Sequence, residues 1–314
     1  MKDFGNILAP YGSQAALIAG ETRYLLAMAT IVFLVVAAVL LTAVLRHRRS
    51  PPAARTPEAR IALAVGLALA VTTAVLAANL VIDMRVAHAL GHLSRDDALT
   101  IRVTGQQWWW QLDYQHASPS KMLTTANELH IPAGEPVLLE LRSTDVIHSF
   151  WVPELHGKRD LIPGLPGALW IEATEPGVFR GECAEFCGHQ HANMGLLVVV
   201  EPRADFERWY EAQLASTTLP QEPLALEGRQ AFLDNGCPLC HSVRGTEAGG
   251  RVGPDLTHLA SRQTIAAGRL PNSTAALQRW VVDPHVFKPG VKMPQNPLTP
   301  RELEALVVYL ESLR

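Results

Sequence analysis

Residues 183–194 read CAEFCGHQHANM, and this stretch decides the fold of the domain around it. It places Cys183, Cys187, His191 and Met194 at the spacing C-x3-C-x3-H-x2-M. Thiolate and thioether sulfur together with imidazole select copper, and a His2Cys set with a weak axial Met is the electron-transfer type. A mononuclear site of that type needs one cysteine, whereas two thiolates on a short loop can bridge two copper ions. The loop therefore predicts a binuclear copper centre that moves electrons.

A second histidine must come from elsewhere in the chain, because each bridged ion would need one imidazole. His148, in the stretch DVIHSF at residues 145–150, is the best candidate. A Cys2His2 zinc site could use the same atoms, and a disulfide between Cys183 and Cys187 is conceivable outside the cytosol. Zinc has no use for the methionine, and a disulfide needs neither His nor Met, so copper is favoured.

The sequence CPLCH at residues 237–241 is the second chemical motif. In c-type haem attachment, the cysteines of C-x-x-C-H form thioethers to two vinyl groups and the histidine is the proximal iron ligand. These roles would fall to Cys237, Cys240 and His241. Met293 is the expected sixth ligand, and Met/His ligation raises the haem potential; the alternative is a buried apolar side chain. A zinc ribbon would need a second C-x-x-C pair, which the chain lacks.

Two apolar runs without charges, at residues 24–45 and 61–82, precede both motifs. Each would form a helix of about 33 Å, enough to cross a hydrocarbon core of about 30 Å. A signal peptide fits less well, because its apolar region is shorter. The chain is 48% hydrophobic and 18% charged, and its net charge of −3 indicates no basic face for nucleic acid. We therefore expect a two-helix transmembrane hairpin.

The loop between the apolar runs sets the orientation. It holds five arginines against one acid, Glu58; the arginines are Arg46, Arg48, Arg49, Arg55 and Arg60. By the positive-inside rule this loop is cytoplasmic, so both termini and both metal sites lie on the outer, periplasmic face. That is the side on which c-type haem is attached, so topology and chemistry agree.

The remaining segments suggest three parts after an N-terminal part at residues 1–97. Residues 98–215 hold short strands, at 99–104, 137–142, 178–182 and 196–201, and a helix at 205–214. Because a ligand loop between adjacent strands is typical of cupredoxins, we expect a cupredoxin-like β-barrel. Residues 216–223 read as a linker. In residues 224–314, amphipathic segments at 227–235 and 299–313 predict the crossing helices of an all-α class I cytochrome c domain.

The copper loop resembles the CuA loop of subunit II of haem-copper cytochrome c oxidases. The likeness extends to residues 145–153, to KRDLIPG at 158–164 and to GQQWWW at 105–110, in the family's order. With the haem motif, the chain resembles the caa type, in which a cytochrome c domain is fused to the CuA domain. Gln106 stands where the family usually has His, and Leu165 where many members have a basic residue after I-P-G.

The resemblance assigns roles to individual residues. It implies copper ligation by His148, Cys183, Cys187, His191 and Met194 and by the backbone carbonyl of Glu185. The Glu185 side chain would reach a Mg2+ ion at the boundary with the catalytic subunit. His189 could compete with His191 for copper, but the spacing from Cys187 favours His191.

The resemblance also implies how electrons enter and what surrounds the site. Trp108 would be the exposed tryptophan through which electrons reach CuA, whereas Trp110 is expected to pack and Trp109 to point to the opposite face. An acid near the second membrane run guards a proton channel in some relatives, but Glu58 could equally be a solvated flanking residue.

The implied function is that of the subunit through which electrons enter a bacterial cytochrome c oxidase, an oxidoreductase and translocase of the cell membrane. Electrons would pass from haem c to CuA and on to the haems of a separate catalytic subunit I, which reduces O2 to water and pumps protons. Subunit III and an outside donor, such as a cytochrome c or a quinol-cytochrome c reductase, are the other expected partners. The alternatives are the same subunit on a nitric oxide reductase, and a membrane-anchored copper carrier, which would need no haem.

Overall fold

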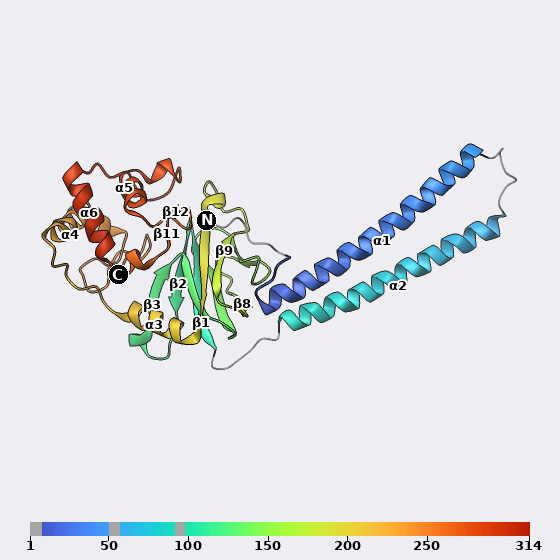
Figure 1. Ribbon diagram of the computed structural model, residues 1–314, viewed down its shortest axis with the longest axis horizontal. Helices are drawn as coiled ribbons and strands as arrows, with labels where there is room; N and C mark the ends of the chain where they lie inside the picture. The colour runs from blue at the N-terminus through green and yellow to red at the C-terminus, as the bar shows by residue number, and fades with distance from the viewer. Residues whose placement is uncertain (1–7, 50–56, 92–97) are drawn as a thin grey trace. The chain divides into compact units, whose positions relative to one another are not determined.

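A computed structural model describes residues 8–49, 57–91 and 98–314 of the chain (Figure 1). Arg55 of the predicted cytoplasmic loop lies outside these residues, as does the side chain of Arg49. The chain divides into two compact units, one of residues 16–93 and one of residues 1–15 with 94–314.

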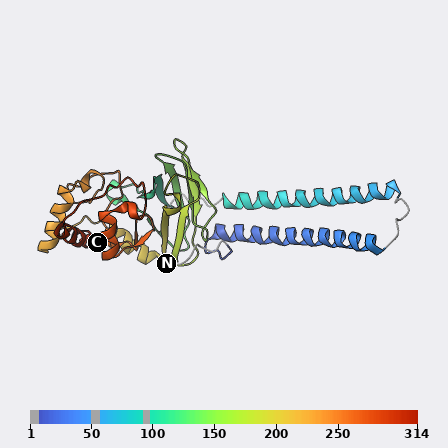
Figure 2. The same ribbon diagram turned by 90° about the horizontal axis from the view of Figure 1, so that it is seen from above.

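The first unit is an antiparallel pair of long helices, α1 (Ser13–Arg49) and α2 (Glu58–Leu90) (Figures 1 and 2). Both contain the predicted apolar runs and continue beyond them, because Ala- and Leu-rich flanks favour helix. Their apolar side chains are exposed, with Phe33 at 70%. Polar side chains bond back to their own helices, for example Thr30 Oγ1 to the Leu26 carbonyl at 2.8 Å. Length and composition suit a membrane span, and Glu58 lies in the first turn of α2.

The second unit begins with ten strands in two sheets. The first sheet has the order β3-β2-β1-β5-β8, formed by Leu123–Ala126, Trp109–Tyr114, Leu99–Gln106, Val137–Ser143 and Gly167–Ile171. The second has the order β4-β10-β9-β6-β7, formed by Glu128–Pro132, Gly195–Glu201, Gly177–Cys183, His148–Trp151 and Arg159–Leu161. Parallel pairs β1–β5 and β10–β4 interrupt otherwise antiparallel pairing. Together with helix α3 (Arg203–Leu214), we call these strands the β domain.

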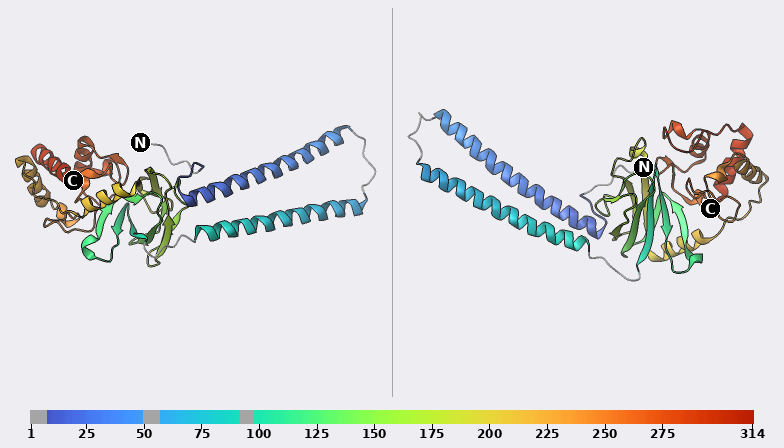
Figure 3. Two further views of the ribbon diagram at one scale, coloured as in Figure 1. Left: turned by 60° about the horizontal axis from the view of Figure 1, so that its bottom comes forward. Right: turned by 180° about the vertical axis from the view of Figure 1, so that it is seen from behind.

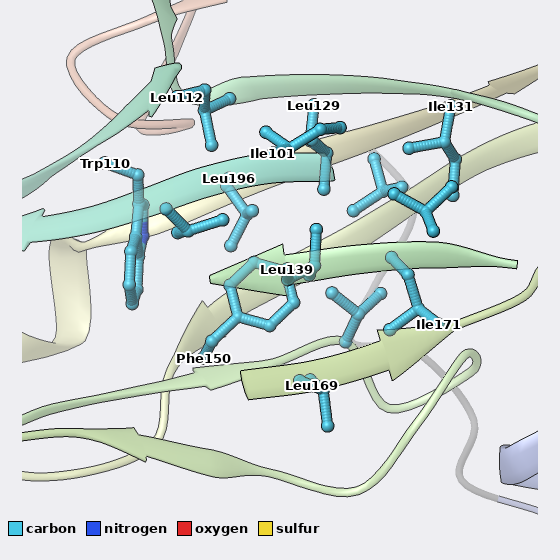
Figure 4. Packing of buried hydrophobic residues seen from close by; sticks show 14 of the residues in the cluster. Ile101, Trp110, Leu112, Leu129, Ile131, Leu139, Phe150, Leu169, Ile171 and Leu196 are labelled. Atoms are coloured by element: carbon cyan, nitrogen blue, oxygen red, sulfur yellow. The ribbon is translucent and has the colours of Figure 1, made fainter. Parts of the chain in front are cut away.

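A shared apolar core holds the two sheets together (Figure 4). Side chains alternate along β2 and β5, so that every second residue is buried, as expected for sheets with one face against a core. Ile101 and Leu139 of the first sheet and Leu129 and Phe150 of the second are almost fully buried. This two-sheet architecture confirms the predicted cupredoxin-like fold. All four strands expected from the sequence are present, each one or two residues longer than predicted.

The C-terminal domain follows, and we define it as α4 (Pro223–Asp234) to α6 (Pro300–Ser312), with α5 (Thr274–Val282) between them. Helices α4 and α6 cross closely at Gly228, where an added Cβ would lie 1.9 Å from the Ala305 carbonyl oxygen. Thr299 and Glu302 form a capping box at the start of α6. Helix α4 begins one turn before the predicted residue 227, with Pro223 in its first turn. The expected pair of crossing helices is therefore present.

The short elements of the C-terminal domain are turns and a small ribbon. The 3-10 turns are η3 (Cys237–Leu239), η4 (Leu259–Ser261) and η5 (Pro284–Val286), and the ribbon is β11 (Thr264–Ile265) with β12 (Leu270–Pro271). The β domain has two further turns, η1 (Pro119–Lys121) and η2 (His191–Asn193).

Direct hydrogen bonds join the β domain to the C-terminal domain, which lie side by side in the same unit (Figure 3). The Glu128 carboxylate accepts from the Thr264 amide at 2.7 Å, and the Gly195 amide donates to the Ala267 carbonyl at 3.0 Å. The segment predicted as a linker is also tied down, because Thr217 Oγ1 donates to the Arg244 carbonyl at 2.7 Å. The two domains therefore form a docked pair.

Candidate metal centres

Six candidate copper donors meet at one end of the β domain. The sulfurs of Cys183 and Cys187 lie 3.7 Å apart at the centre of this group. His148 Nδ1 is 3.9 Å from the Cys183 sulfur, and His191 Nδ1 is 3.7 Å from the Cys187 sulfur. The Met194 Sδ is 3.9 Å from Cys187, and the carbonyl oxygen of Glu185 is 3.2 Å from Cys183. Each thiol thus has one imidazole and one weaker donor beside it.

Strand pairing brings His148 to the loop from 35 residues away. His148 opens β6 and Cys183 closes β9, and these strands pair with Phe150 opposite Cys183. The loop is closed by the Cys183 amide, which donates to the Met194 carbonyl at 3.0 Å. These backbone bonds set the donor positions without help from a metal.

Gly188 allows the loop to turn between the second cysteine and the histidine. Its φ of +111° lies in the region that favours glycine. An added Cβ would also lie 3.1 Å from the side-chain nitrogen of Gln107 and 3.3 Å from the Trp108 ring. A larger residue here would therefore push the copper loop away from these two side chains.

Asp145 orients the His148 ring. One carboxylate oxygen lies 2.8 Å from His148 Nε2, and the other accepts from the Gln107 amide at 2.7 Å. Burial would raise the pKa of Asp145, but the hydrogen bonds from His148 and Gln107 outweigh this effect, so the pKa is lowered. For His148, burial would lower the pKa, but the contacts with Cys183 and Asp145 outweigh this effect, so the pKa is raised. A carboxylate on the outer nitrogen leaves Nδ1 for a metal.

The two thiols are free and close enough to share metal ions. Their separation of 3.7 Å excludes the disulfide alternative in this structure, because a disulfide bond is about 2.05 Å long. One thiolate is favoured, since contact with Cys187 lowers the pKa of Cys183 to about 3. The same contact raises the pKa of Cys187. In the described part of the chain, the donor atoms of His148, Cys183 and Cys187 lie within 4.8 Å of one another, close enough to hold a metal ion together.

The side chains of Glu185 and His189 are not among the six candidate copper donors. The Glu185 carboxylate accepts from the Phe186 amide at 3.2 Å and is not in the metal-binding group found among the described residues. The Phe186 side chain beside it is 74% exposed. His189 is exposed, whereas His191 contacts the Cys187 sulfur.

The prediction that Trp108 is exposed is wrong, because its side chain is only 8% exposed. Its indole packs near Gly188, and Nε1 donates to the Cys187 carbonyl at 3.0 Å. Lys288 of the C-terminal domain bonds to the Trp108 carbonyl at 2.7 Å. Trp110 is fully buried in the core, as predicted, while Trp109 is partly exposed. Docking of the C-terminal domain explains why Trp108 is covered.

A cavity of about 360 Å3 lies against Trp108 and runs into the C-terminal domain. This volume is within the range of cofactor pockets, about 300–1,000 Å3. The four haem-motif residues Cys237, Cys240, His241 and Met293 line it. Apolar side chains complete the lining, among them Phe232, Leu277, Val281, Leu306 and Leu310. An apolar cleft edged by two thiols and two axial donors fits a covalently attached haem.

The surroundings of His241 suit an iron ligand. Nδ1 lies 2.8 Å from the Pro254 carbonyl oxygen, which leaves Nε2 for iron. Burial lowers the pKa of His241, so the ring is kept neutral. At Gly253 an added Cβ would lie 2.6 Å from the imidazole, so only glycine fits beside it.

Sequence reasoning missed the residues that connect the two centres. Asp145 could have been suspected, because it lies three residues before the predicted ligand His148. Lys288, Gln190 and Arg262 carried no local signal. Gln190 donates to the Pro289 carbonyl at 2.7 Å, which links the copper loop to the C-terminal domain.

Comparisons with known proteins match both domains. A family model for the periplasmic domain of cytochrome c oxidase subunit II matches residues 115–201, and one for cytochrome c matches residues 225–314. Cytochrome c oxidase subunit 2 of Alkalihalophilus pseudofirmus is 36% identical, covering 98% of this chain and 90% of the relative. That of Bacillus subtilis is 30% identical over 70% of this chain and 63% of the relative.

Among solved structures, the periplasmic domain of subunit II of cytochrome oxidase of Bradyrhizobium japonicum is 29% identical. The match covers 38% of this chain and 96% of the chain in that structure, with a TM-score of 0.36. The two matched family ranges contain every candidate copper and haem ligand described above.

Proposed function

Because the chain belongs to the cytochrome c oxidase subunit II family and carries a fused cytochrome c domain, we propose that it passes electrons from a c-type haem to a binuclear CuA centre. It is a membrane subunit of an oxidoreductase complex, and electrons enter that complex through it. The observation that carries the proposal is Trp108, which lines the haem cavity and donates to the Cys187 carbonyl at 3.0 Å.

On the haem side, the cavity residues would hold the cofactor. Cys237 and Cys240 would bind it through thioethers, and His241 and Met293 would be its axial ligands. When bound, the haem supplies a one-electron couple. Trp108 then bridges the cavity and the copper loop with one aromatic ring and one hydrogen bond. No acid, base or nucleophile is needed for outer-sphere electron transfer.

On the copper side, the two cysteine sulfurs would bridge two ions, with His148 and His191 as one imidazole for each. Met194 and the Glu185 carbonyl would be the weak axial donors. Zinc accounts for this set less well, because a structural zinc site is complete with four ligands and needs no thioether. Ligands held by paired strands move little on electron transfer, which suits a relay.

The partners follow from the family and from the exposed surface. We propose that CuA reduces the haems of catalytic subunit I, where O2 is reduced to water and protons are pumped, with subunit III in the same complex. Phe186, exposed beside Glu185, supports a contact surface at the copper loop. The outside donor would be a cytochrome c or a quinol-cytochrome c reductase. The arginines around residues 46–60 support a periplasmic location for both domains.

The domain limits proposed from the sequence are 1–97, 98–215, 216–223 and 224–314. They agree with the end of α3 at Leu214 and depart by one residue from the start of α4 at Pro223. The segment between them is the proposed linker, docked rather than free in this structure.

The test is electron paramagnetic resonance and absorption of the full chain produced with copper and haem maturation. We expect a seven-line copper hyperfine pattern, because one unpaired electron is shared by two equivalent copper nuclei. A near-infrared band and a low-spin c-type haem spectrum should accompany it. A four-line copper signal, or stoichiometric zinc without a copper signal, would exclude the binuclear centre.

Replacing Glu185 by alanine should separate its two proposed roles. The backbone carbonyl beside Cys183 is retained, so the seven-line copper signal should persist. The carboxylate is lost, so Mn2+, a paramagnetic substitute for Mg2+, should bind the assembled oxidase at least about tenfold more weakly. Mn2+ titration followed by its resonance signal measures this, with Glu182→Ala as the control. Loss of the copper signal, or unchanged Mn2+ binding, would contradict the assignment.

A further inference from the structure

Lys288 is a cation of the C-terminal domain buried in the contact with the β domain. Its side chain is 2% exposed, and Nζ donates to the Trp108 carbonyl at 2.7 Å and the Ala266 carbonyl at 3.4 Å. In the described part of the chain, no carboxylate lies within ion-pair distance of this ammonium. An ammonium has three N–H donors, so one remains without a protein partner. Burial lowers the pKa of Lys288 to about 7, which shows how poorly the protein alone compensates the charge.

Arg262 is a second cation at this contact; the residue is partly buried, and its Nε is a buried, unused donor. Its Nη2 donates to the Asp255 carbonyl and, at 3.5 Å, to Thr125 Oγ1 of the β domain. Its Nε has no hydrogen-bond partner in the structure. A buried polar atom without a partner is rare in proteins and calls for a missing one.

The carboxylates nearest to Arg262 are already engaged. Glu128 accepts from the Thr264 amide at 2.7 Å and from its hydroxyl at 3.3 Å. Asp255 accepts from Ser242 Oγ at 2.7 Å and from the Thr257 amide at 2.8 Å. Neither Lys288 nor Arg262 forms an ion pair within the described residues, so their free donors are open to an anionic group bound in the cavity.

Both cations line the cavity that also contains Cys237, Cys240 and Met293. A c-type haem carries two propionate carboxylates, on pyrroles other than those whose vinyl groups meet the cysteines. We propose that Lys288 and Arg262 hold these propionates and, through Trp108 and Thr125, fasten the propionate edge of the haem to the β domain. This inference rests on the proposed function, because it presumes that haem fills the cavity.

The consequence is a short connection between the two centres. The Lys288 ammonium would touch a propionate on one side and the Trp108 carbonyl on the other. The Trp108 indole then reaches the Cys187 carbonyl. Lys288 is thus a positioning residue that sets the electrostatic environment of the haem and its placement against Trp108.

The test uses the full chain loaded with copper and haem and compares three variants. Lys288→Met removes the ammonium and keeps the length of the side chain, and Lys288→Arg keeps the charge. Lys121→Met is the control for the same chemical change, because Lys121 is exposed in the β domain and does not line the cavity, so water and salt screen its charge. The readout is the haem midpoint potential from spectroelectrochemistry, with the copper resonance signal recorded in each variant.

Removal of a buried positive charge favours the oxidised haem. For Lys288→Met we expect a roughly tenfold change in the haem redox equilibrium. For a one-electron couple this is a fall of about 59 mV in the haem midpoint potential. Lys121→Met should change this equilibrium less than about twofold, and Lys288→Arg should keep the wild-type value. Equal shifts in Lys288→Met and Lys121→Met, or no shift in either, would overturn the proposal.

Two further outcomes are also decisive. If Lys288→Met fails to retain haem, Lys288→Arg decides: haem retention at the wild-type potential supports the role of the charge, and haem loss in both variants refutes it. If the unmodified protein itself lacks the haem spectrum or the seven-line signal, the proposed function fails. A failure confined to the Lys288 variants leaves that function intact.

Discussion

Replacing Cys187 by serine is expected to abolish the seven-line copper signal and to slow electron transfer into the oxidase by on the order of 100-fold or more. Loss of even outer partners of metal ligands typically costs 10–100-fold, and Cys187 would be a bridging ligand itself. Its sulfur lies within 4 Å of Cys183, His191 and Met194, so the variant removes the atom common to these contacts. A serine hydroxyl is a hard, weak ligand for copper.

The measurement combines copper resonance of the loaded variant with turnover of the assembled oxidase. His189→Ala is the matched control, because it removes a possible donor from the same loop but an exposed one outside the cluster. That variant should keep both the signal and the turnover. A seven-line signal surviving in Cys187→Ser would show that Cys187 does not bridge.

Replacing Met293 by leucine is expected to leave the haem attached but without its sixth ligand. Cys237, Cys240 and His241 would still hold it, so the c-type pigment should form. Axial ligands set haem potentials over a range of about 0.8 V, so loss of the thioether should lower the potential by roughly 100 mV or more. The haem should also become high-spin.

Absorption spectra and a potentiometric titration of the haem test this expectation. Met122→Leu is the control for the same chemical change, since Met122 is 40% exposed in the β domain. An unchanged low-spin spectrum and potential in Met293→Leu would mean that another group binds the iron.

The sequence could indicate the proposed metal chemistry because most of the candidate ligands are neighbours in the chain. Cys183, Cys187, His191 and Met194 share one loop, so their spacing nearly determines their geometry. The same holds for the proposed haem motif at residues 237–241, where five residues contain two candidate attachment cysteines and one candidate iron ligand. The apolar runs were equally local, and the helices extend past them only because their flanks also favour helix.

For the rest of the β domain, the sequence indicated which segments form strands but not which strands pair or which side chains are covered. Strand patterns located β1, β5, β9 and β10 but not the parallel pairing of β1 with β5, which depends on contacts between residues far apart. Trp108 was expected on the surface, but it lies buried beside the copper loop. Its exposure depends on what packs over it, and no local pattern carries that information.

Taken alone, the sequence determined which donor atoms exist and which of them share a loop, because spacing within one element sets distance. Only the tertiary structure decided what joins the two centres. The strand pairing of β6 with β9 brought His148 to the thiols, and domain docking brought Lys288 to Trp108, 180 residues away. Such contacts depend on how whole domains pack, and the spacing of residues along the chain does not encode that.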